Sequence, residues 1–503
     1  MQTILSFLPI LILLVCLLGL KLSAMRAGAV ALISAVCFSL VLFRPGVKGL
    51  TIAMGKGFGL ALFVIFIIWG AIFLYNLEKE TGALDVINKN IERTIEDKLL
   101  QFLLISWVFS AFLQGIAGFG VPVIVATPIL ICMGFDPLMS AAAVLVGHSW
   151  AISFGSMGSS ISAIDMVTNT HILDIVRYMA VFGIVGMVVT GLAVLFIYDG
   201  LKGIRQGFAY LLAASVTMGI SLVILARTGM TSVMGLLSGS VGIVTLLAVN
   251  GIRTHGKKPE LYRSKLNLFE AFLPYFLIIV LSVAFFIISP KLKITLDFPG
   301  YISGTGTEVP AEEAYVSFNV LKYPFSIILM SSLISGFVFV KRGALDGKTA
   351  KKIIQNTVRK CTSTTITLVL LLITAQIMMD AGMINNLAVF LASVTKGFYP
   401  FVAPFIGLLG AFVTGSNTNS NIIFGNLQET AASALGISTA ITCAVQSIGA
   451  SIGGAIGPTT VALGATAAQA VGREPDIYAR TLWPTLIGTA VLGAVNLLLI
   501  YVL

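Results

Sequence analysis

The chain has 503 residues, of which 57% are hydrophobic and 10% are charged, and its net charge is +10. A soluble domain carries about a quarter charged residues, so this composition and the mean hydropathy of +1.01 exclude a soluble enzyme or nucleic-acid-binding protein and indicate a protein of the lipid bilayer. The five cysteines lie in or at the ends of apolar segments without a paired motif, so neither a disulfide framework nor a cysteine-rich metal site is expected.

The first apolar run, residues 4–20, predicts a membrane-spanning helix. No basic residue precedes it, whereas Lys21 and Arg26 follow it, so it differs from a cleaved signal peptide. Because basic residues gather on the cytoplasmic side, the N-terminus is expected outside. Two further spans, 27–43 and 51–77, then place the charged segment 78–98 in the cytoplasm.

Residues 100–163 have to change sides of the membrane once, yet they contain three apolar pieces. The middle piece, 121–133, has 13 residues, and a bilayer of roughly 30 Å takes about 20 helical residues to cross. We therefore expect a re-entrant hairpin over 100–133 that turns at "GIAGFGVP", followed by one crossing over 138–163. Irregular backbone at that depth has to be surrounded by protein or by a water-filled cavity.

Three loops orient the middle of the chain. Residues 250–265 carry five Lys and Arg against one acidic residue, and residues 341–360 carry seven against one, so both loops are expected in the cytoplasm. The segment between them, 289–323, carries three basic and four acidic residues, as expected for an outside loop. Spans over 175–197, 207–226 and 232–249 connect the first hairpin region to these loops.

The second half starts with a span near 362–380. A second hairpin is expected over 400–435, with its arms entering from outside and its turn at "TGSNTNSN", where residues 416–421 are six consecutive uncharged polar residues. A crossing near 438–468 and a last span over 481–502 complete the chain.

The two hairpins belong to an internal repeat. The segment "AFLQG" at 111–115 matches "AFVTG" at 411–415, and in both halves the hairpin is followed by a glycine and, 21 residues later, by another glycine. The order of span, amphipathic segment (78–98 and 384–398), hairpin, crossing and span recurs around these matches. Because the hairpins enter from opposite sides, the repeat is inverted, which is typical of secondary transporters with a central site.

These elements predict an all-α polytopic membrane protein, with about 12 transmembrane helices plus two re-entrant hairpins in two inverted-topology repeats. A single transporter domain covers 1–503. Within it, the first repeat is 51–197 with its hairpin at 100–133, and the second is 361–503 with its hairpin at 400–435. Residues 198–360 hold the connecting helices and the basic loops.

Neither hairpin region contains Lys or Arg, and its acidic residues are Asp136 and Glu429, the latter expected at the outer rim. An uncharged site binds through N–H groups at broken-helix N-termini, which favour anions, through neutral hydroxyls and amides, and through glycines that admit a ligand to the backbone. These groups suit a small, singly charged solute. They can also form hydrogen bonds with the backbone N–H and C=O groups that lose their partners where a helix is broken. The candidate substrate-binding residues are Gln114, Gly115, Gly118, Gly120, His148, Ser149, Thr414, Gly415, Ser416, Asn417, Thr418, Asn419, Asn421 and Gln446.

His148 is the titratable residue on the crossing that follows the first hairpin. Ten residues at about 1.5 Å each from Leu138 place it roughly 15 Å deep, near the midplane. A buried histidine can be purely structural, but an ionisable group inside a membrane is a functional candidate, so His148 is the expected proton-coupling residue. The segment "GASIG" at 449–453 resembles a lipase motif, yet no His follows it. We therefore expect no enzyme, no catalytic residue, no metal and no cofactor.

The chain resembles the L-lactate permease family at five segments: "AFLQGIAGFGVPV", "GFDPL", "FGSMG", "FVTGSNTNSN" and "AASALGIS". They stand in that family's order and spacing, and the similarity runs loosely over nearly the whole chain. The resemblance implies an inner-membrane symporter that takes up lactate, and often glycolate, with protons. The fold it implies is that of the wider ion-transporter group with paired re-entrant hairpins.

Three departures from the family bear on the coupling ion. Better-known members carry a glutamate at the position of Gln114, an aspartate at that of Asn417 and an amide at that of His148. The segment "SNT" at 416–418 resembles instead the tips of sodium-coupled dicarboxylate carriers. The leading hypothesis is a proton- or cation-coupled carrier of lactate-like 2-hydroxymonocarboxylates, with proton coupling through His148 expected. A sodium-coupled carrier of another small organic anion and an anion-selective channel stay open, as does the oligomeric state.

Overall fold

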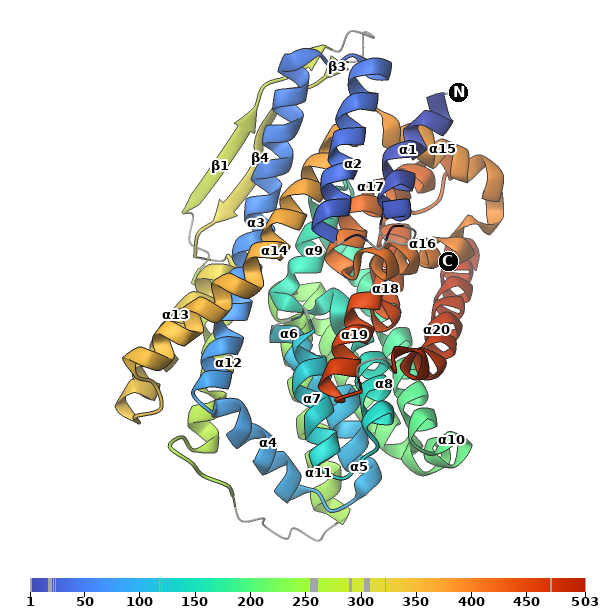
Figure 1. Ribbon diagram of the computed structural model, residues 1–503. Helices are drawn as coiled ribbons and strands as arrows, with labels where there is room; N and C mark the ends of the chain where they lie inside the picture. Colours follow the sequence, from blue (N-terminus) through green and yellow to red (C-terminus); the bar gives the residue numbers. More distant parts are fainter. Residues whose placement is uncertain are drawn as a thin grey trace.

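The computed structural model describes residues 2–16, 20, 22, 24–116, 118, 120–253, 261–288, 292–302, 308–321, 323–470 and 473–502. These residues form an elongated helical body with a short β-ribbon along one side near one end (Figure 1). The mostly helical, polytopic membrane class expected from the sequence is confirmed, with the ribbon as an addition.

The first half of the chain contains eleven of the α-helices of the described residues. They are α1 (Gln2–Leu14), α2 (Ala24–Phe38), α3 (Gly46–Glu80), α4 (Ala83–Thr94), α5 (Lys98–Leu103), α6 (Ser110–Ile116), α7 (Val121–Cys132), α8 (Pro137–Gly147), α9 (Ser159–Asp165), α10 (Ile172–Thr228) and α11 (Met234–Arg253). A π-helical segment, Leu104–Phe109, joins α5 to α6. Two 3₁₀ turns, Ser149–Phe154 and Ser156–Gly158, separate α8 from α9.

The second half adds the ribbon and nine helices. In chain order these elements are α12 (Leu268–Ile288), β1 (Lys293–Phe298), β2 (Tyr301–Ile302), β3 (Glu308–Val309), β4 (Glu312–Asn319), α13 (Pro324–Lys341), α14 (Gly347–Asp380), α15 (Met383–Thr395), α16 (Tyr399–Thr414), α17 (Asn417–Leu435), α18 (Thr439–Gly453), α19 (Pro458–Ala467) and α20 (Glu474–Val502). β1 pairs antiparallel with β4, and β2 with β3. The strands were not predicted, since 289–323 was expected as an outside loop.

Eight helices within the described residues are long and apolar enough to cross a membrane, or nine if the bent pair Pro137–Gly147 and Ser149–Asp165 counts as one span. α10 has 57 residues and reverses at Asp199 and Gly200, whose φ/ψ angles are non-helical. It therefore supplies both of the spans expected over 175–197 and 207–226. Shorter apolar helices lie at Met25–Val41, Leu268–Leu281 and Phe325–Lys341.

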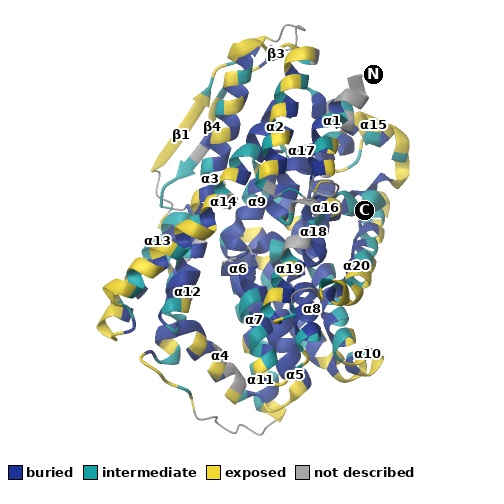
Figure 2. Ribbon diagram, viewed as in Figure 1, coloured by how far each residue is buried: buried dark blue, intermediate teal, exposed yellow. Residues whose placement is uncertain are grey.

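The outer face of α10 shows why this body requires lipid. Large apolar side chains are exposed at every fourth position of its second arm: Phe208, Leu212, Val216, Ile220 and Ile224. Residues spaced by four lie on one helix face, so they form a continuous apolar stripe. The buried residues concentrate instead around α6, α8 and α18, in the middle of the molecule (Figure 2).

The two hairpins enter from opposite ends of the body (Figure 1). α5, α6 and α7 rise from the end that also holds α4, whereas α16 and α17 descend from the end that holds α15. Every residue from Leu99 to Ile116 is buried in protein, which is the surrounding that a re-entrant segment requires. The hairpins at 100–133 and 400–435 are thus present as helix–break–helix units.

The segments expected on one side of the membrane also lie together. Asn250 donates to the carbonyl of Thr94 at 2.9 Å, and Asn90 donates to that of Tyr262 at 3.0 Å, so α4 contacts the ends of the chain segment expected as a basic loop. Residues 254–260 of that loop lie outside the described residues. The ribbon is at the opposite end of the body (Figure 1).

α3 and α14 form an antiparallel pair. Two polar contacts between them involve corresponding positions of the two halves of the chain. Lys56 on α3 lies 3.7 Å from Asp380 on α14, and Asn356 on α14 donates to Glu80 on α3 at 3.2 Å. The positions 56 and 356, like 80 and 380, differ by 300, which is the offset of the matching hairpin segments. Each helix is followed by a left-handed glycine, Gly82 or Gly382, and by an amphipathic helix. This reciprocal pattern is the one expected of an inverted repeat.

Candidate functional site

Four chain breaks meet in the middle of the molecule: between α6 and α7, α8 and α9, α16 and α17, and α18 and α19. They surround a cavity of about 230 Å³. The cavity is lined by Gln114, Gly120, His148, Ile152, Ser156, Ser160, Gly415, Ser416, Asn417, Thr418, Gly454, Thr460 and Leu463. Residues from both hairpins and both crossings therefore share one space, and no Asp, Glu, Lys or Arg is among them.

The crossings are broken, which the sequence analysis did not predict. It expected continuous spans over 138–163 and 438–468, whereas α8 ends at Gly147 and α18 at Gly453. In the first break, Ser156 and Met157 have positive φ angles of 48° and 53°, a conformation that costs non-glycine residues of order 1–3 kcal/mol and that clusters at functional sites. The second break is made by the glycine-rich segment 453–457.

The second hairpin presents a helix N-terminus to the cavity. Gly415 has a φ of +67° and ends α16, and Ser416, in extended conformation, caps α17 by accepting a hydrogen bond from the N–H of Asn419 at 3.3 Å. The first N–H groups of a helix have no partner within it, and the helix dipole adds positive potential there. The N–H groups of Asn417 and Thr418 therefore provide donors that suit an anion without a charged side chain.

Asn417 has an unpaired acceptor in this region. Its side chain is 2% exposed, and its Nδ2 donates to Oγ of Ser153 at 2.8 Å. Its Oδ1 is buried and has no hydrogen-bond partner among the described residues. A buried acceptor without a partner costs about 1–3 kcal/mol, so this oxygen is suited to a donor group on a ligand.

The first hairpin contributes an amide and a tight turn. The N–H of Gly118 donates to Oγ of Ser156 at 2.9 Å, and Gly120 has a φ of +81° at the start of α7. A Cβ added at Gly118 or at Gly155 would lie 2.9 Å or 2.7 Å from Nε2 of Gln114. These glycines therefore hold the Gln114 amide close to the backbone at the edge of the cavity.

His148 lies at the end of α8, where the crossing breaks. It is 3% exposed, lines the cavity, and its Nδ1 lies 2.5 Å from the carbonyl oxygen of Val144. A carbonyl oxygen only accepts hydrogen bonds, so Nδ1 carries the hydrogen in this arrangement. The neutral imidazole then has a free lone pair on Nε2, which can take up a proton or accept from a ligand.

Several predicted residues lie beside the cavity and hold its walls. Asn421 donates to the carbonyl of Ser160 at 3.0 Å and to Oγ of Ser447 at 2.9 Å. The Asn419 N–H belongs to the cap of α17, and Ser149 donates to the carbonyl of Val146 at 2.7 Å. Thr414 is the last residue of α16, and its side chain lies outside the described part.

The packing around two further candidate residues, Gly115 and Gln446, shows a structural role for each. A Cβ at Gly115 would lie 2.3 Å from the backbone nitrogen of Leu236, so Gly115 permits close contact of α6 with α11 and does not line the cavity. Gln446 donates to Ser420 at 3.1 Å and accepts from Gln428 at 2.9 Å, which fixes α18 against the second hairpin. From residue type alone, a glycine or glutamine that packs helices together cannot be distinguished from one that contacts a ligand.

Glu429, expected at the outer rim, is buried against a loop. It is 7% exposed and accepts from the N–H of Asn169 at 2.8 Å and from the N–H and hydroxyl of Thr170, both at 2.6 Å. The carboxylate thus ties α17 to the loop between α9 and α10.

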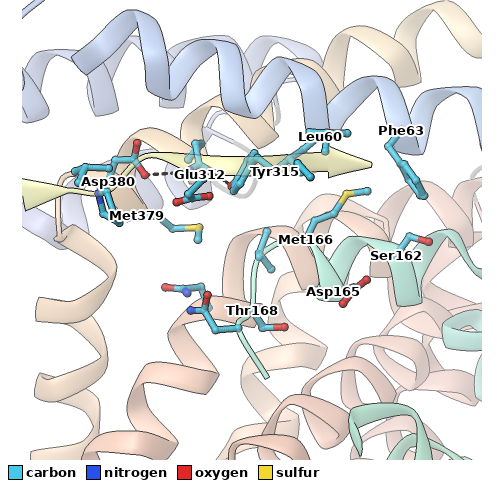
Figure 3. A pocket seen from close by; sticks show the side chains of 18 of the residues that line it. Leu60, Phe63, Ser162, Asp165, Met166, Thr168, Glu312, Tyr315, Met379 and Asp380 are labelled. Atoms are coloured by element: carbon cyan, nitrogen blue, oxygen red, sulfur yellow. Dashed lines mark hydrogen bonds between the residues drawn. The ribbon is translucent and has the colours of Figure 1, made fainter. Parts of the chain in front are cut away.

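A larger cavity of about 700 Å³ lies between the ribbon and the α9–α10 loop (Figure 3). Three carboxylates line it, those of Asp165, Glu312 and Asp380. The buried Lys56 pairs with Glu312 at 3.2 Å and with Asp380 at 3.7 Å. Since the carboxylates outnumber this cation, the larger cavity disfavours an anion, and the smaller, uncharged cavity is the better candidate for an anion site.

α9 and α17 separate the two cavities. Ser160 and Thr418 line the smaller one, and Asp165 and Asn426, further along the same helices, line the larger one. The hydroxyl oxygens of Ser160 and Thr418 are 3.2 Å apart. Together with the contact from Asn421 to Ser160, this pair closes the seam between α9 and α17.

The sequence analysis missed Ile152, Ser153, Ser156, Ser160, Gly454, Thr460 and Leu463. Except for Leu463, these residues lie in two matching segments, "ISFGSMGSS" and "GGAIGPTT". Both are dense in Gly and Ser, which also occur in continuous membrane helices at helix contacts. For that reason the sequence analysis predicted these segments to be parts of unbroken membrane-spanning helices.

Comparison with known proteins agrees with this architecture. The profile of the family described as L-lactate permease matches residues 2–503. An L-lactate permease of Streptococcus iniae is 29% identical over 445 residues, covering 86% of this chain and 91% of its own length. The glycolate permease of Escherichia coli is 28% identical, covering 100% of this chain and 96% of its own. The crystal structure of the YdaH transporter of Alcanivorax borkumensis covers 94% of this chain and 98% of its own, with a TM-score of 0.50 at 14% identity, a likeness of fold alone.

Proposed function

Because the chain belongs to the L-lactate permease family, we propose that it is a secondary transporter of L-lactate and related short 2-hydroxymonocarboxylates such as glycolate, coupled to protons, in the plasma membrane of a prokaryotic cell. The observation that carries the proposal is the uncharged cavity of about 230 Å³, which both hairpins line. It offers helix N–H groups, neutral amides and one histidine, and its volume lies below the range of about 300–1,000 Å³ that drug-sized pockets have.

The groups in the cavity complement a 2-hydroxy acid. Its carboxylate accepts from the N–H groups at the start of α17 and from the amide of Gln114, since both are donors. Its hydroxyl donates to the unpaired Oδ1 of Asn417. Such a substrate therefore satisfies a buried acceptor that has no partner among the described residues.

His148 is the proposed proton carrier. Inward movement of one carboxylate against a negative-inside potential costs about 2.3 kcal/mol per 100 mV, so accumulation requires at least one co-transported cation. His148 is the titratable residue among the described residues that line the cavity, and the lone pair on its Nε2 can take up a proton. Protonation at Nε2 creates a cation that pairs with the substrate carboxylate, which makes proton and anion binding mutually favourable.

The transport cycle proposed here uses the two repeats, 51–197 and 361–503, joined by 198–360. The reciprocal contacts of α3 and α14 and the opposite directions of the hairpins support this division. Related half-molecules of opposite orientation have two equivalent packings. Exchange between these packings exposes the central cavity first to one side and then to the other.

The test is uptake by purified protein in liposomes. Labelled lactate, glycolate, pyruvate and succinate are offered under an imposed pH gradient or an imposed sodium gradient. The proposal expects saturable uptake of lactate and glycolate driven by the pH gradient, with counterflow of preloaded lactate. Uptake that requires sodium and ignores the pH gradient would favour the sodium-coupled alternative, for which the neutral oxygens of Asn417 and Asn421 would be candidate ligands. Large unitary currents without counterflow would indicate an anion channel.

A further inference from the structure

Among the described residues, two apolar side chains line the otherwise polar or glycine-rich cavity: Ile152 from the first crossing and Leu463 from the second. Ile152 is the residue of the turn Ser149–Phe154 that remains partly exposed, while its neighbours in that turn are buried. Leu463 on α19 is likewise partly exposed. Both side chains therefore face the space that the polar groups surround.

Each of these side chains ends over a glycine of the other half of the chain. A Cβ added at Gly454 would lie 2.7 Å from Cδ1 of Ile152, and a Cβ added at Gly120 would lie 2.5 Å from Cδ1 of Leu463. The two contacts are reciprocal: a first-half side chain covers a second-half glycine, and the reverse. The glycines leave room that the tips of Ile152 and Leu463 occupy.

We propose, building on the transport function above, that Ile152 and Leu463 set the length of the substrate's carbon chain. A 2-hydroxymonocarboxylate has its polar groups on C1 and C2, so its variable part begins at C3. Glycolate has no C3, lactate has a methyl group there, and 2-hydroxybutyrate has an ethyl group. With the carboxylate and hydroxyl held by the polar wall, the C3 group lies against the two apolar side chains, which accept a methyl group and exclude longer chains.

Paired variants test this inference. Leu463→Ala and Ile152→Ala widen the apolar wall, whereas Gly454→Ala narrows it, because the added Cβ meets the flexible end of Ile152 and no other atom within 4 Å. Gly251→Ala is the control, since a Cβ there meets nothing within 4 Å. Each variant is reconstituted, and kcat/KM for glycolate, L-lactate and L-2-hydroxybutyrate is measured.

Leu463→Ala and Ile152→Ala are expected to raise kcat/KM for 2-hydroxybutyrate relative to that for lactate by about 10-fold or more. The reason is that one methylene in an apolar pocket changes discrimination roughly 10- to 200-fold. Gly454→Ala should lower kcat/KM for lactate relative to that for glycolate. The control Gly251→Ala should leave both ratios of kcat/KM unchanged. If a widening variant is poorly folded, Ile152→Val and Leu463→Val provide the same comparison with a smaller change. Unchanged ratios in active variants would overturn the inference, whereas a wild-type protein that transports none of the three acids would overturn the proposed function instead.

Discussion

At the scale of single residues, the account depends on His148 because the other residues lining the cavity carry no charge. His148→Asn keeps a polar side chain of similar size but cannot take up a proton. We expect this variant to lose accumulation of lactate driven by a pH gradient, since no proton is carried, and to retain exchange of preloaded lactate. Both are measured in liposomes.

His171 provides the matched control for that variant. Its side chain is 68% exposed and lies 3.9 Å from Asp174, outside the cavity. His171→Asn should therefore accumulate lactate like the wild type. Full proton-driven accumulation by His148→Asn would show that another group carries the proton.

Alanine variants of Asn417 and Gln114 test whether these two side chains bind the substrate. Each is expected to lose one hydrogen bond to the substrate when it is replaced by Ala, which costs about 1–3 kcal/mol, or roughly 5- to 150-fold in affinity. Lactate affinity is measured by binding to the detergent-solubilised variants. Asn386→Ala is the control, because Asn386 contacts Ser6 on α1. Unchanged affinity in both well-folded variants would place the site elsewhere.

At the scale of elements, the proposed anion site lies at the start of α17, and Gly415 precedes this helix. Gly415 and Gly436 flank this helix, and both have a φ of +67°. Replacing either by Ala forces a side chain into the left-handed region at a cost of about 1–2 kcal/mol. We expect both variants to lower the melting temperature to a similar degree.

The two variants should differ in lactate affinity. Gly415→Ala displaces the N-terminus of α17 and is expected to weaken binding at least 10-fold, whereas Gly436→Ala, at the far end, should bind like the wild type. Binding is measured at a temperature where both variants are folded. Equal affinities for Gly415→Ala and Gly436→Ala would mean that the helix N-terminus does not contact the substrate.

The elements also show how far the sequence could predict the structure. The short apolar piece 121–133 and the polar turn at 416–421 predicted chain breaks that the structure contains between α6 and α7 and between α16 and α17, because bilayer thickness constrains helix length. The breaks after Gly147 and Gly453 escaped prediction, since small residues are compatible with continuous membrane helices and the breaks depend on contacts such as that of Gly118 with Ser156. The role of Gly115 escaped for a similar reason: its neighbour, Leu236, is distant in the sequence.

At the scale of the whole molecule, the cycle requires the seam between α9 and α17 to open, since it separates the central cavity from the larger one. The hydroxyl oxygens of Ser160 and Thr418 lie 3.2 Å apart across this seam, so cysteine sulfur atoms in their place have to approach by only about 1 Å to reach the S–S length of about 2.0 Å. In the double variant Ser160→Cys, Thr418→Cys, oxidation is expected to stop lactate exchange and reduction to restore it. The oxidised single variants are the controls for the native cysteines. Normal exchange by fully cross-linked protein would show that this seam does not open.

The most direct test of the central claim is a structure determined by electron cryo-microscopy with L-lactate present. The account predicts density for one lactate in the cavity of about 230 Å³, with its carboxylate at the start of α17 and its hydroxyl at Asn417. Lactate bound instead in the cavity of about 700 Å³, beside Lys56 and Asp380, would contradict it.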